Sequence, residues 1–197
     1  MSRGLAFFDF DGTITFKDTL LEFIRFSRGS AAFYSGFALH APWLMLMKLG
    51  VLPNQKVKER VLAHFFKGMP EDEMSVHCRR FIEQKLPQLL RPKALAEIEL
   101  LRSKGIEVVI VSASPENWIA GWAQPRGIRL ISSKLEVAAN RITGNLVGIN
   151  CHGEEKVRRI RAEYSISDLS GIYAYGDSEA DKPMLALAEH AFFKPFR

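Results

Sequence analysis

Two aspartates stand two positions apart at the end of a continuous apolar run, and this pairing restricts the possible folds more than any other feature. The run LAFFDF at residues 5–10 has the length of a strand and indicates one that is buried on both faces of a sheet. Asp9 and Asp11 would lie where this strand ends. At a separation of roughly 6 Å and an effective dielectric constant near 20, their carboxylates repel each other by about 3 kcal/mol. The sequence therefore predicts that a cation binds beside them.

The second half of the chain alternates between helical and strand-like segments. Residues 91–105 combine a helical spacing of apolar residues with a proline near the start and a glycine at the end, and residues 106–114 form a second apolar run rich in β-branched side chains. The other expected elements are a helix at 116–123, a strand at 129–132, a hairpin within 140–148, a helix at 154–164, a strand at 171–178, a helix at 182–190 and a strand at 191–193. This order predicts an α/β fold with a parallel sheet.

The stretch between the first strand and this alternating part shows only helical patterns. It runs from Asp18 to about Lys85. We therefore expect an inserted all-helical domain, a cap at residues 17–86. Residues 1–16 and 87–197 would together form the α/β core.

Three of the expected strands end in short polar clusters. These clusters lie at residues 9–13, 112–114 and 176–178. Ligands of parallel α/β proteins bind beyond the carboxyl ends of the strands, so adjacent strands would bring the clusters into one crevice. Asp9, Asp11 and Asp177 would then form an all-oxygen site, and these loops contain neither His nor Cys. Such a donor set favours magnesium over zinc.

The same loops offer groups that suit a phosphate. Gly12, Thr13 and Ser112, together with the amides beside Ser112 such as that of Ala113, can donate hydrogen bonds to phosphate oxygens. Lys156, at the start of an expected helix, would supply a compact positive charge for phosphoryl transfer. Any one of these residues alone could be an ordinary solvated group. Their convergence at consecutive strand ends is what predicts a phosphate site.

Taken together, these residues resemble the four motifs of the haloacid dehalogenase superfamily. The matching segments are DFDGT at 9–13, Ser112 in VVIVSAS, Lys156 in HGEEK, and GDSEAD at 176–181. The helical insertion after the first motif and the segment RITG resemble the phosphoserine-phosphatase-like branch. The apolar insertion and the HGEEK context are similar to phosphatidylglycerophosphatase C-type proteins. The resemblance implies a Rossmann-like core with an inserted cap, and phosphatase activity.

The resemblance also implies a mechanism for a magnesium-dependent phosphomonoester phosphatase. Asp9 would be the nucleophile that forms an aspartyl-phosphate. Asp11 would first protonate the leaving alkoxide and then activate water as a base. Magnesium would be held by a carboxylate oxygen of Asp9, the backbone carbonyl of Asp11 and the side chain of Asp177.

Other residues acquire supporting roles from the same resemblance. Ser112 and Lys156 would hold the transferring phosphoryl group, and Asp181 would orient Lys156 or the water ligands of the metal. In phosphoserine phosphatases a glutamate of the helix that enters the cap binds the substrate amine. The matching position here is Asp18 in FKDTL, one methylene shorter, which puts serine in doubt as part of the substrate.

The stretch 29–47 contains no charged residue and has the length of a membrane span, about 20 residues. Pro42 and several small or polar residues near its middle argue against a span. Trp43 and the aromatic residues within 33–37 would suit either a membrane interface or the core of a small helical bundle. Three interpretations therefore stay open: a buried helix pair of the cap, a surface that contacts lipid, and a transmembrane helix. The substrate would be a small phosphorylated metabolite or a lipid phosphate such as phosphatidylglycerophosphate.

The charge and the motifs of the chain limit the classes of partner that it is expected to bind. The 197-residue chain has a net charge of +5, and its basic clusters suit solvated helix faces, an anionic substrate or an anionic membrane surface. No recognised nucleic-acid-binding motif accompanies this charge, so nucleic acid is not an expected partner.

Cys78 and Cys151 form no metal or redox motif and are typical of reduced thiols. The N-terminal apolar stretch is too short for a signal peptide, so we expect a cytoplasmic protein, with contact of the cap to the inner face of the membrane as an alternative. The oligomeric state stays open.

Two other functions remain open from the sequence. The first is a phosphotransferase that passes the phosphoryl group from Asp9 to an alcohol acceptor. The second is a non-catalytic, membrane-associated module on the same fold. The presence of every motif residue argues against the second.

Overall fold

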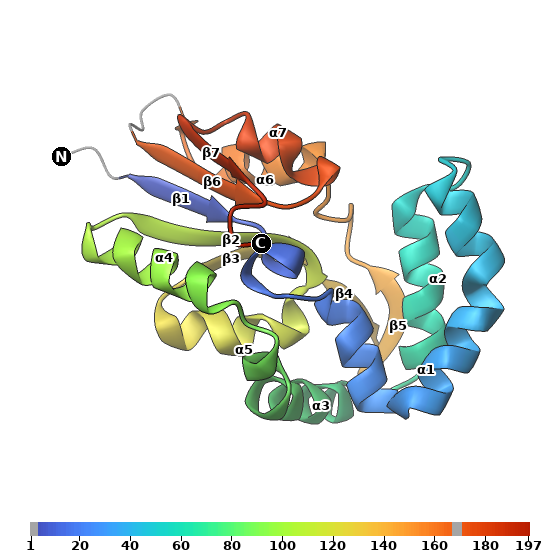
Figure 1. The fold of residues 1–197 in the computed structure, drawn as a ribbon. Coiled ribbons are helices and arrows are strands. Elements are labelled where there is room, and N and C mark those ends of the chain that lie inside the picture. Colours follow the sequence, from blue (N-terminus) through green and yellow to red (C-terminus); the bar gives the residue numbers. More distant parts are fainter. Residues whose placement is uncertain (1–3, 167–170) are drawn as a thin grey trace.

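Five parallel strands form one sheet in the computed structural model, which describes residues 4–166 and 171–197 (Figure 1). The order of the strands is β3-β2-β1-β6-β7, and β1 pairs in parallel with both β2 and β6. The strands are β1 (Leu5–Phe8), β2 (Glu107–Pro115), β3 (Arg129–Ser133), β6 (Ile172–Gly176) and β7 (His190–Phe193). The predicted α/β fold is confirmed. Because the strands run in one direction, the loops after β1, β2 and β6 open at the same edge of the sheet.

Helices cover both faces of this sheet (Figure 1). Ala6 and Phe8 of β1 belong to the hydrophobic cluster that includes α4 and α5, whereas Leu5 and Phe7 belong to the cluster that includes α6 and α7. These helices are α4 (Pro92–Ser103), α5 (Ala120–Ala123), α6 (Glu154–Glu163) and α7 (Lys182–Leu185). Each fully buried phenylalanine contributes about 2–3 kcal/mol relative to an exposed one. The central strand is therefore anchored from both sides, as its continuous apolar run predicted.

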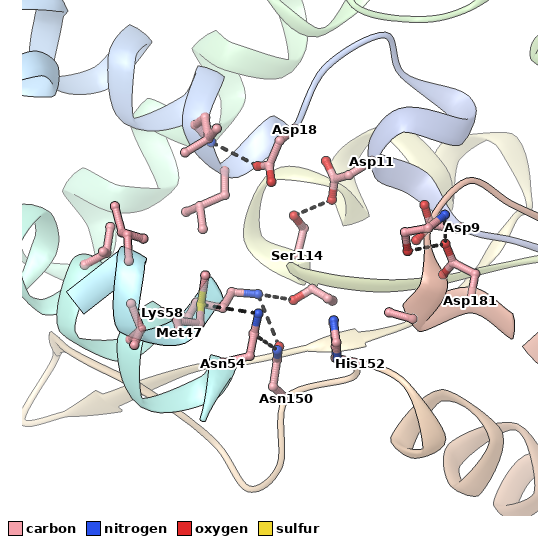
Figure 2. A pocket seen from close by; sticks show the side chains of 18 of the residues that line it. Asp9, Asp11, Asp18, Met47, Asn54, Lys58, Ser114, Asn150, His152 and Asp181 are labelled. Atoms are coloured by element: carbon pink, nitrogen blue, oxygen red, sulfur yellow. Dashed lines mark hydrogen bonds between the residues drawn. The ribbon is translucent and has the colours of Figure 1, made fainter. Parts of the chain in front are cut away.

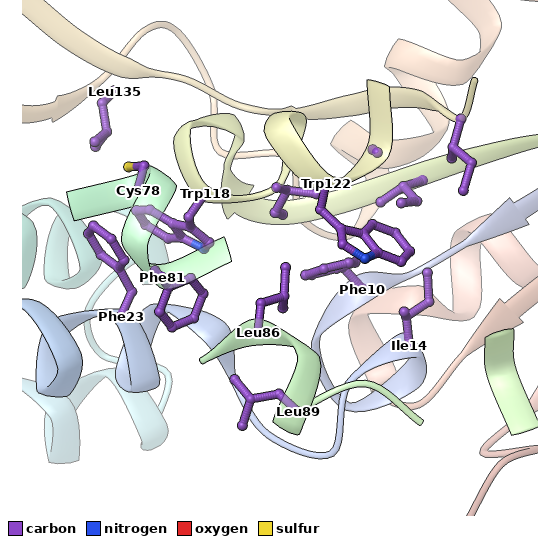
Figure 3. Close-up of a cluster of buried hydrophobic side chains, with 14 of the residues drawn as sticks. Phe10, Ile14, Phe23, Cys78, Phe81, Leu86, Leu89, Trp118, Trp122 and Leu135 are labelled. Atoms are coloured by element: carbon purple, nitrogen blue, oxygen red, sulfur yellow. The ribbon is translucent and has the colours of Figure 1, made fainter. Parts of the chain in front are cut away.

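Three further helices lie beyond the carboxyl edge of the sheet (Figure 1). They are α1 (Thr19–Lys48), α2 (Asn54–Phe66) and α3 (Glu71–Gln84), and we call them the helical insertion. Their core is continuous with that of the sheet layer, since Phe23 and Phe81 pack around Trp118 beside Phe10 and Trp122 (Figure 3). The division of the chain into a core and a separate cap domain stays a prediction.

Short helical turns connect these elements. They lie at Phe10–Ile14, Leu86–Gln88, Glu116–Trp118, Gln124–Arg126 and Glu179–Asp181. The expected helix at 116–123 is divided into the turn at Glu116–Trp118 and the single turn of α5, whereas the helix expected at 182–190 is shorter than predicted because α7 ends at Leu185.

Helix α1 changes direction at Gly29. The backbone there has φ 82° and ψ 163°, a combination that only glycine adopts without strain. The first half buries Phe23 and Ile24, and the second half packs beside α2 at the outer side of the molecule (Figure 1). The uncharged stretch 29–47 thus forms the outer half of a bent helix. Among the described residues, no helix is both long enough and apolar enough to pass through a bilayer.

The hairpin lies earlier in the chain than the sequence predicted. Its strands are β4 (Leu135–Ala138) and β5 (Arg141–Leu146), so the expected range 140–148 contains one arm only. Ala139 and Asn140 form the turn with φ values of 49° and 58°. Two positive φ values suit a tight hairpin turn, but the usual Asn-Gly signal is missing because alanine occupies the first position. The hairpin packs against α2, where Gly144 lies directly on the backbone of Ala63.

We expect Gly144→Ala to destabilise the protein strongly. A Cβ at this position would overlap the backbone of Ala63, and φ is +92°. Overpacking and backbone strain together should lower the free energy of unfolding by about 3 kcal/mol, measured by urea denaturation. Gly148→Ala is the matched control, since its φ is +71° and nothing lies within 4 Å of the added Cβ. Equal losses in the two variants would contradict the close α2–β5 contact.

Candidate active site

A cavity of about 340 Å³ lies between the carboxyl ends of the strands and helices α1 and α2 (Figure 2). Its floor carries the side chains of Asp9, Asp11, Lys156, Asp177 and Asp181, which come from the loops after β1 and β6 and from α6. Ala113 and Ser114 at the end of β2 line the same cavity, so the three clusters expected to converge do so, and most of the predicted polar residues share one cavity.

A buried lysine joins two carboxylates at the bottom of this cavity. The Lys156 Nζ donates hydrogen bonds of 2.6 Å to Asp9 Oδ1 and to Asp181 Oδ1. Burial raises the pKa of Asp9 to about 7 despite the opposing charge of Lys156, and the carboxylates of Asp181 and Asp11 add to the rise. Burial also disfavours the ammonium form of Lys156, but the two carboxylates outweigh it and raise the pKa of Lys156. The pKa of Asp181 is lowered because Lys156 and Ser178 outweigh the effect of burial.

Asp11 is held by donors from two elements, helix α1 and strand β2. Its Oδ1 accepts hydrogen bonds of 2.6 Å from both the backbone N–H and the hydroxyl of Thr19, in the first turn of α1. Its Oδ2 accepts one of 2.6 Å from Ser114 and a longer one of 3.5 Å from Ser112, both in β2. The indole of Trp118 donates to the Thr19 hydroxyl at 3.1 Å. The Asp11 carboxylate is therefore fixed in orientation, in contact with both the sheet and the helical insertion.

Asp177 and Asp181 complete an acidic cluster with Asp9. One carboxylate oxygen from each of the three lies within 4.8 Å of the others. Asp181 Oδ2 accepts hydrogen bonds from the backbone of Asp177 and from Ser178, so both of its oxygens already have protein partners. Asp177 accepts a hydrogen bond from the exposed Arg197. Both oxygens of Asp9 also have protein partners, Lys156 and Thr13, so Asp177, whose side-chain partner is the exposed Arg197, is the carboxylate of the cluster least committed to buried contacts.

Glycine at position 12 is required by this arrangement. Its φ is +83°, and a Cβ there would overlap the carboxylate of Asp177. The backbone after β1 can therefore approach Asp177 only because the residue is Gly12.

The other predicted residues occupy different places around the cavity. Ser112 and Thr13 are buried and do not line the cavity. The Ser112 hydroxyl accepts the Ser114 N–H at 3.0 Å, and Thr13 donates to Asp9 Oδ2 at 3.2 Å. Ala113 lines the cavity, and its carbonyl faces a lysine of α2. Asp18 also lines the cavity and begins α1 by accepting the Leu21 N–H. Asp18 is exposed at its surface, but the desolvation that it undergoes beside the cavity, together with the nearby charge of Asp11, raises its pKa to about 6.

Three residues of the site were missed by the sequence analysis. Thr19 and Ser114 orient Asp11, and the ammonium group of Lys58 reaches from α2 to Ala113 O at 2.5 Å and to Asn150 Oδ1 at 3.2 Å. Burial lowers the pKa of Lys58 to about 8, against the opposing effect of Asp11 and Asp18. The sequence did not distinguish Lys58 from the other basic residues, whose clusters suit solvated helix faces, an anionic substrate or an anionic membrane surface. A hydroxyl two positions after Ser112 was the one available signal for Ser114.

Comparison with known proteins agrees with this geometry. The model of the haloacid dehalogenase-like hydrolase family matches residues 6–186, so the chain belongs to this family and is an enzyme of the hydrolase class. The predicted resemblance to the haloacid dehalogenase superfamily is confirmed. The similarity to phosphatidylglycerophosphatase C-type proteins stays a prediction.

Two relatives and one solved structure are informative. The chain is 35% identical to Protein CicA of Caulobacter vibrioides over 98% of this chain and 86% of that protein. It is 28% identical to a probable phosphatase of Mycobacterium tuberculosis over 96% of this chain and 68% of that protein. A phosphoserine phosphatase structure, described as a phospho-aspartyl intermediate analogue, superposes with a TM-score of 0.71 at 17% identity, covering all of this chain and 95% of that one. At this identity the superposition shows a shared fold.

We expect Lys156→Met to destabilise the protein in a pH-dependent way. The substitution leaves Asp9 and Asp181 buried without a cationic partner, which should lower the free energy of unfolding by about 3 kcal/mol at about pH 8. At about pH 5.5 the loss should be smaller, because carboxylates with raised pKa values bind protons in the folded state before they do so in the unfolded state. Urea denaturation without added metal measures both values. A loss that grows as the pH falls would contradict this electrostatic role.

Proposed function

We propose that the protein is a magnesium-dependent phosphomonoester phosphatase that acts through an aspartyl-phosphate on Asp9. The substrate is a small phosphorylated metabolite or a lipid phosphate. The observation that carries the proposal is the placement of Asp9 and Asp11 at one cavity floor, where Asp9 is paired with Lys156 and Asp11 with hydroxyl groups. The probable phosphatase among the relatives supports the same reaction class.

In the first step a carboxylate oxygen of Asp9 attacks the phosphorus atom. The new O–P bond forms as the bond between phosphorus and the ester oxygen breaks. Lys156 keeps positive charge next to Asp9 and next to the charge that develops on the phosphoryl oxygens. Its contact with Asp181 holds the ammonium group in place, since both partners are almost fully buried.

Asp11 handles the protons of both steps. It gives a proton to the departing alkoxide, and it then takes a proton from the water that attacks the aspartyl-phosphate. The second attack breaks the bond between phosphorus and Asp9 and releases inorganic phosphate. Thr19 and Ser114 hold Asp11 in one orientation, so that the same carboxyl group meets the leaving oxygen and the incoming water.

The residues of the acidic cluster suit magnesium. Its donors are all oxygens, three carboxylates converge within 4.8 Å, and glycine at position 12 allows the loop to approach Asp177 closely. Asp9, Asp177 and the backbone carbonyl of Asp11 would hold the ion, with Asp181 behind them. When bound, magnesium would neutralise the carboxylates and the phosphoryl oxygens, and it would lower the pKa of Asp9 so that the nucleophile is ionised.

The phosphoryl group would be held by several donors of the floor. Lys156 supplies the central charge. The motifs also imply Ser112 and the loop from Gly12 to Thr13 as donors, although none of these residues lines the cavity and both Ser112 and Thr13 are buried. We add Lys58 to this set because its half-buried ammonium group lines the cavity from the side of α2. Asp18 would contact the part of the substrate that lies nearest α1.

Asp9→Asn should abolish turnover. We expect hydrolysis of p-nitrophenyl phosphate with magnesium to fall by at least about 1,000-fold, because an amide cannot act as the nucleophile. Asp72→Asn is the matched control, since Asp72 is exposed on α3. Chelation by EDTA should stop the wild-type reaction and added magnesium should restore it. An active Asp9→Asn enzyme, or a rate that does not depend on magnesium, would refute the proposal.

Lys58 should set the alkaline limit of the reaction. With its pKa lowered to about 8, Lys58 loses its charge above that pH, so wild-type kcat/KM should decline as the pH rises further. Lys58→Arg keeps a charge throughout this range and should remove the decline. Steady-state pH profiles of the two enzymes test this. If kcat/KM declines at the same alkaline pH in the wild-type and Lys58→Arg enzymes, the decline is caused by another ionisable group.

A further inference from the structure

The cavity has a polar floor and an apolar wall. The large apolar side chains that line the cavity all belong to α1 and α2, and they include Leu20, Phe37, Leu44, Met47, Val57 and Val61. The polar groups nearest this wall are few, chiefly Asp18, Asn54 and Lys58 (Figure 2). A phosphate bound at the floor would therefore direct its ester group toward a hydrocarbon-lined space. That space favours an apolar leaving group over a strongly polar one.

The outer half of α1 is also apolar on the side that faces away from the cavity. Leu44 and Met47 line the cavity, whereas Tyr34, Met45 and Leu49 lie on other faces of the same segment and are between 61% and 70% exposed. A helix at the surface of a protein ordinarily presents polar residues to water. Here the same helix is apolar on both its cavity side and its exposed side. Contacts among the described residues explain why the cavity side is apolar, but they do not explain why the exposed side is apolar.

The stretch of sequence that contains this helix segment carries charge of one sign. No acidic residue occurs between Glu22 and Glu59. The basic residues of the same stretch lie on both sides of the uncharged run, at Arg25, Arg28, Lys48, Lys56 and Lys58. Arg60 lies over the ring of Trp43, 4.0 Å from its centroid. An apolar face bordered by cations at both ends is complementary to the surface of an anionic bilayer.

We propose that residues 30–48 of α1, with Leu49 directly after them, lie on an anionic lipid surface, and that the substrate is an amphiphilic phosphomonoester taken from it. This inference rests on the proposed phosphatase function. The exposed side of the helix contacts the lipid, and its cavity side contacts the hydrocarbon next to the phosphate. One segment thereby links membrane binding to substrate selection, because Met45 and Met47 are two positions apart and face different environments.

The first experiment measures chain-length selectivity. Ethyl, butyl and octyl phosphate are compared as monomeric substrates with magnesium. We expect kcat/KM to rise at least about tenfold from ethyl to octyl phosphate, since each buried methylene favours binding. Leu44→Ser should reduce this rise to about threefold or less, because it replaces part of the apolar wall with a hydroxyl group. A flat or falling series for the wild-type enzyme would overturn the amphiphilic substrate.

The second experiment measures membrane binding without any turnover. Wild-type protein should sediment with vesicles of phosphatidylcholine and phosphatidylglycerol, but not with vesicles of phosphatidylcholine alone. Met45→Glu should reduce the bound fraction at least about fivefold, because it places a negative charge on the apolar face. Leu100→Glu is the matched control: it also replaces an exposed apolar helical residue, but in α4, and should bind like wild type.

Other outcomes separate this inference from the proposed function. If the protein hydrolyses p-nitrophenyl phosphate with magnesium but does not bind vesicles, the proposed lipid-binding surface is overturned. The proposed phosphatase function is then still supported. A dimer that dissociates in Met45→Glu, without vesicle binding, would assign the apolar face to a second copy of the chain and also overturn the proposal. Absence of any phosphatase activity would refute the proposed function itself.

Discussion

The double contact of Lys156 is the interaction on which the candidate site depends. One ammonium group lies 2.6 Å from Asp9 at the end of β1 and 2.6 Å from Asp181 in the loop after β6. All three side chains are almost fully buried. Without the ammonium group, the carboxylates of Asp9 and Asp181 would repel each other in a space from which water is excluded. The sequence indicated the same kind of repulsion between Asp9 and Asp11. The lysine thus holds together two loops that would otherwise repel each other.

The rest of the site divides its tasks between two parts of the chain. Residues of the strand ends form the polar floor, where phosphate chemistry needs oxygens and positive charge. Residues of α1 and α2 form the wall, where the rest of the substrate would lie. Thr19 joins the two parts, since it begins α1 and donates to Asp11. Substitutions in the wall could therefore change the substrate specificity without altering Asp9, Asp11 or Lys156.

Much of the floor could be predicted from the sequence, because its residues follow strands whose apolar and β-branched character is local. The paired aspartates, Lys156 and Asp177 all follow from strand ends or a helix start. Lys58 could not be found in this way, since its role depends on the packing of α2 against the loop after β2. The hairpin was predicted at the wrong position in the chain because its turn uses Ala139 and Asn140 rather than a glycine. The bend at Gly29 likewise depends on the packing of the outer half of α1 beside α2, which sequence periodicity does not contain.

The central claim is that Asp9 itself carries the phosphoryl group during turnover. Borohydride reduces an acyl phosphate but leaves free carboxylates intact, so quenching the reaction with borohydride and sequencing the peptides by mass spectrometry tests the claim directly. The account predicts that residue 9 is recovered as homoserine, only when substrate and magnesium are both present. Reduction at Asp11 instead, or unmodified Asp9 throughout steady turnover, would contradict it.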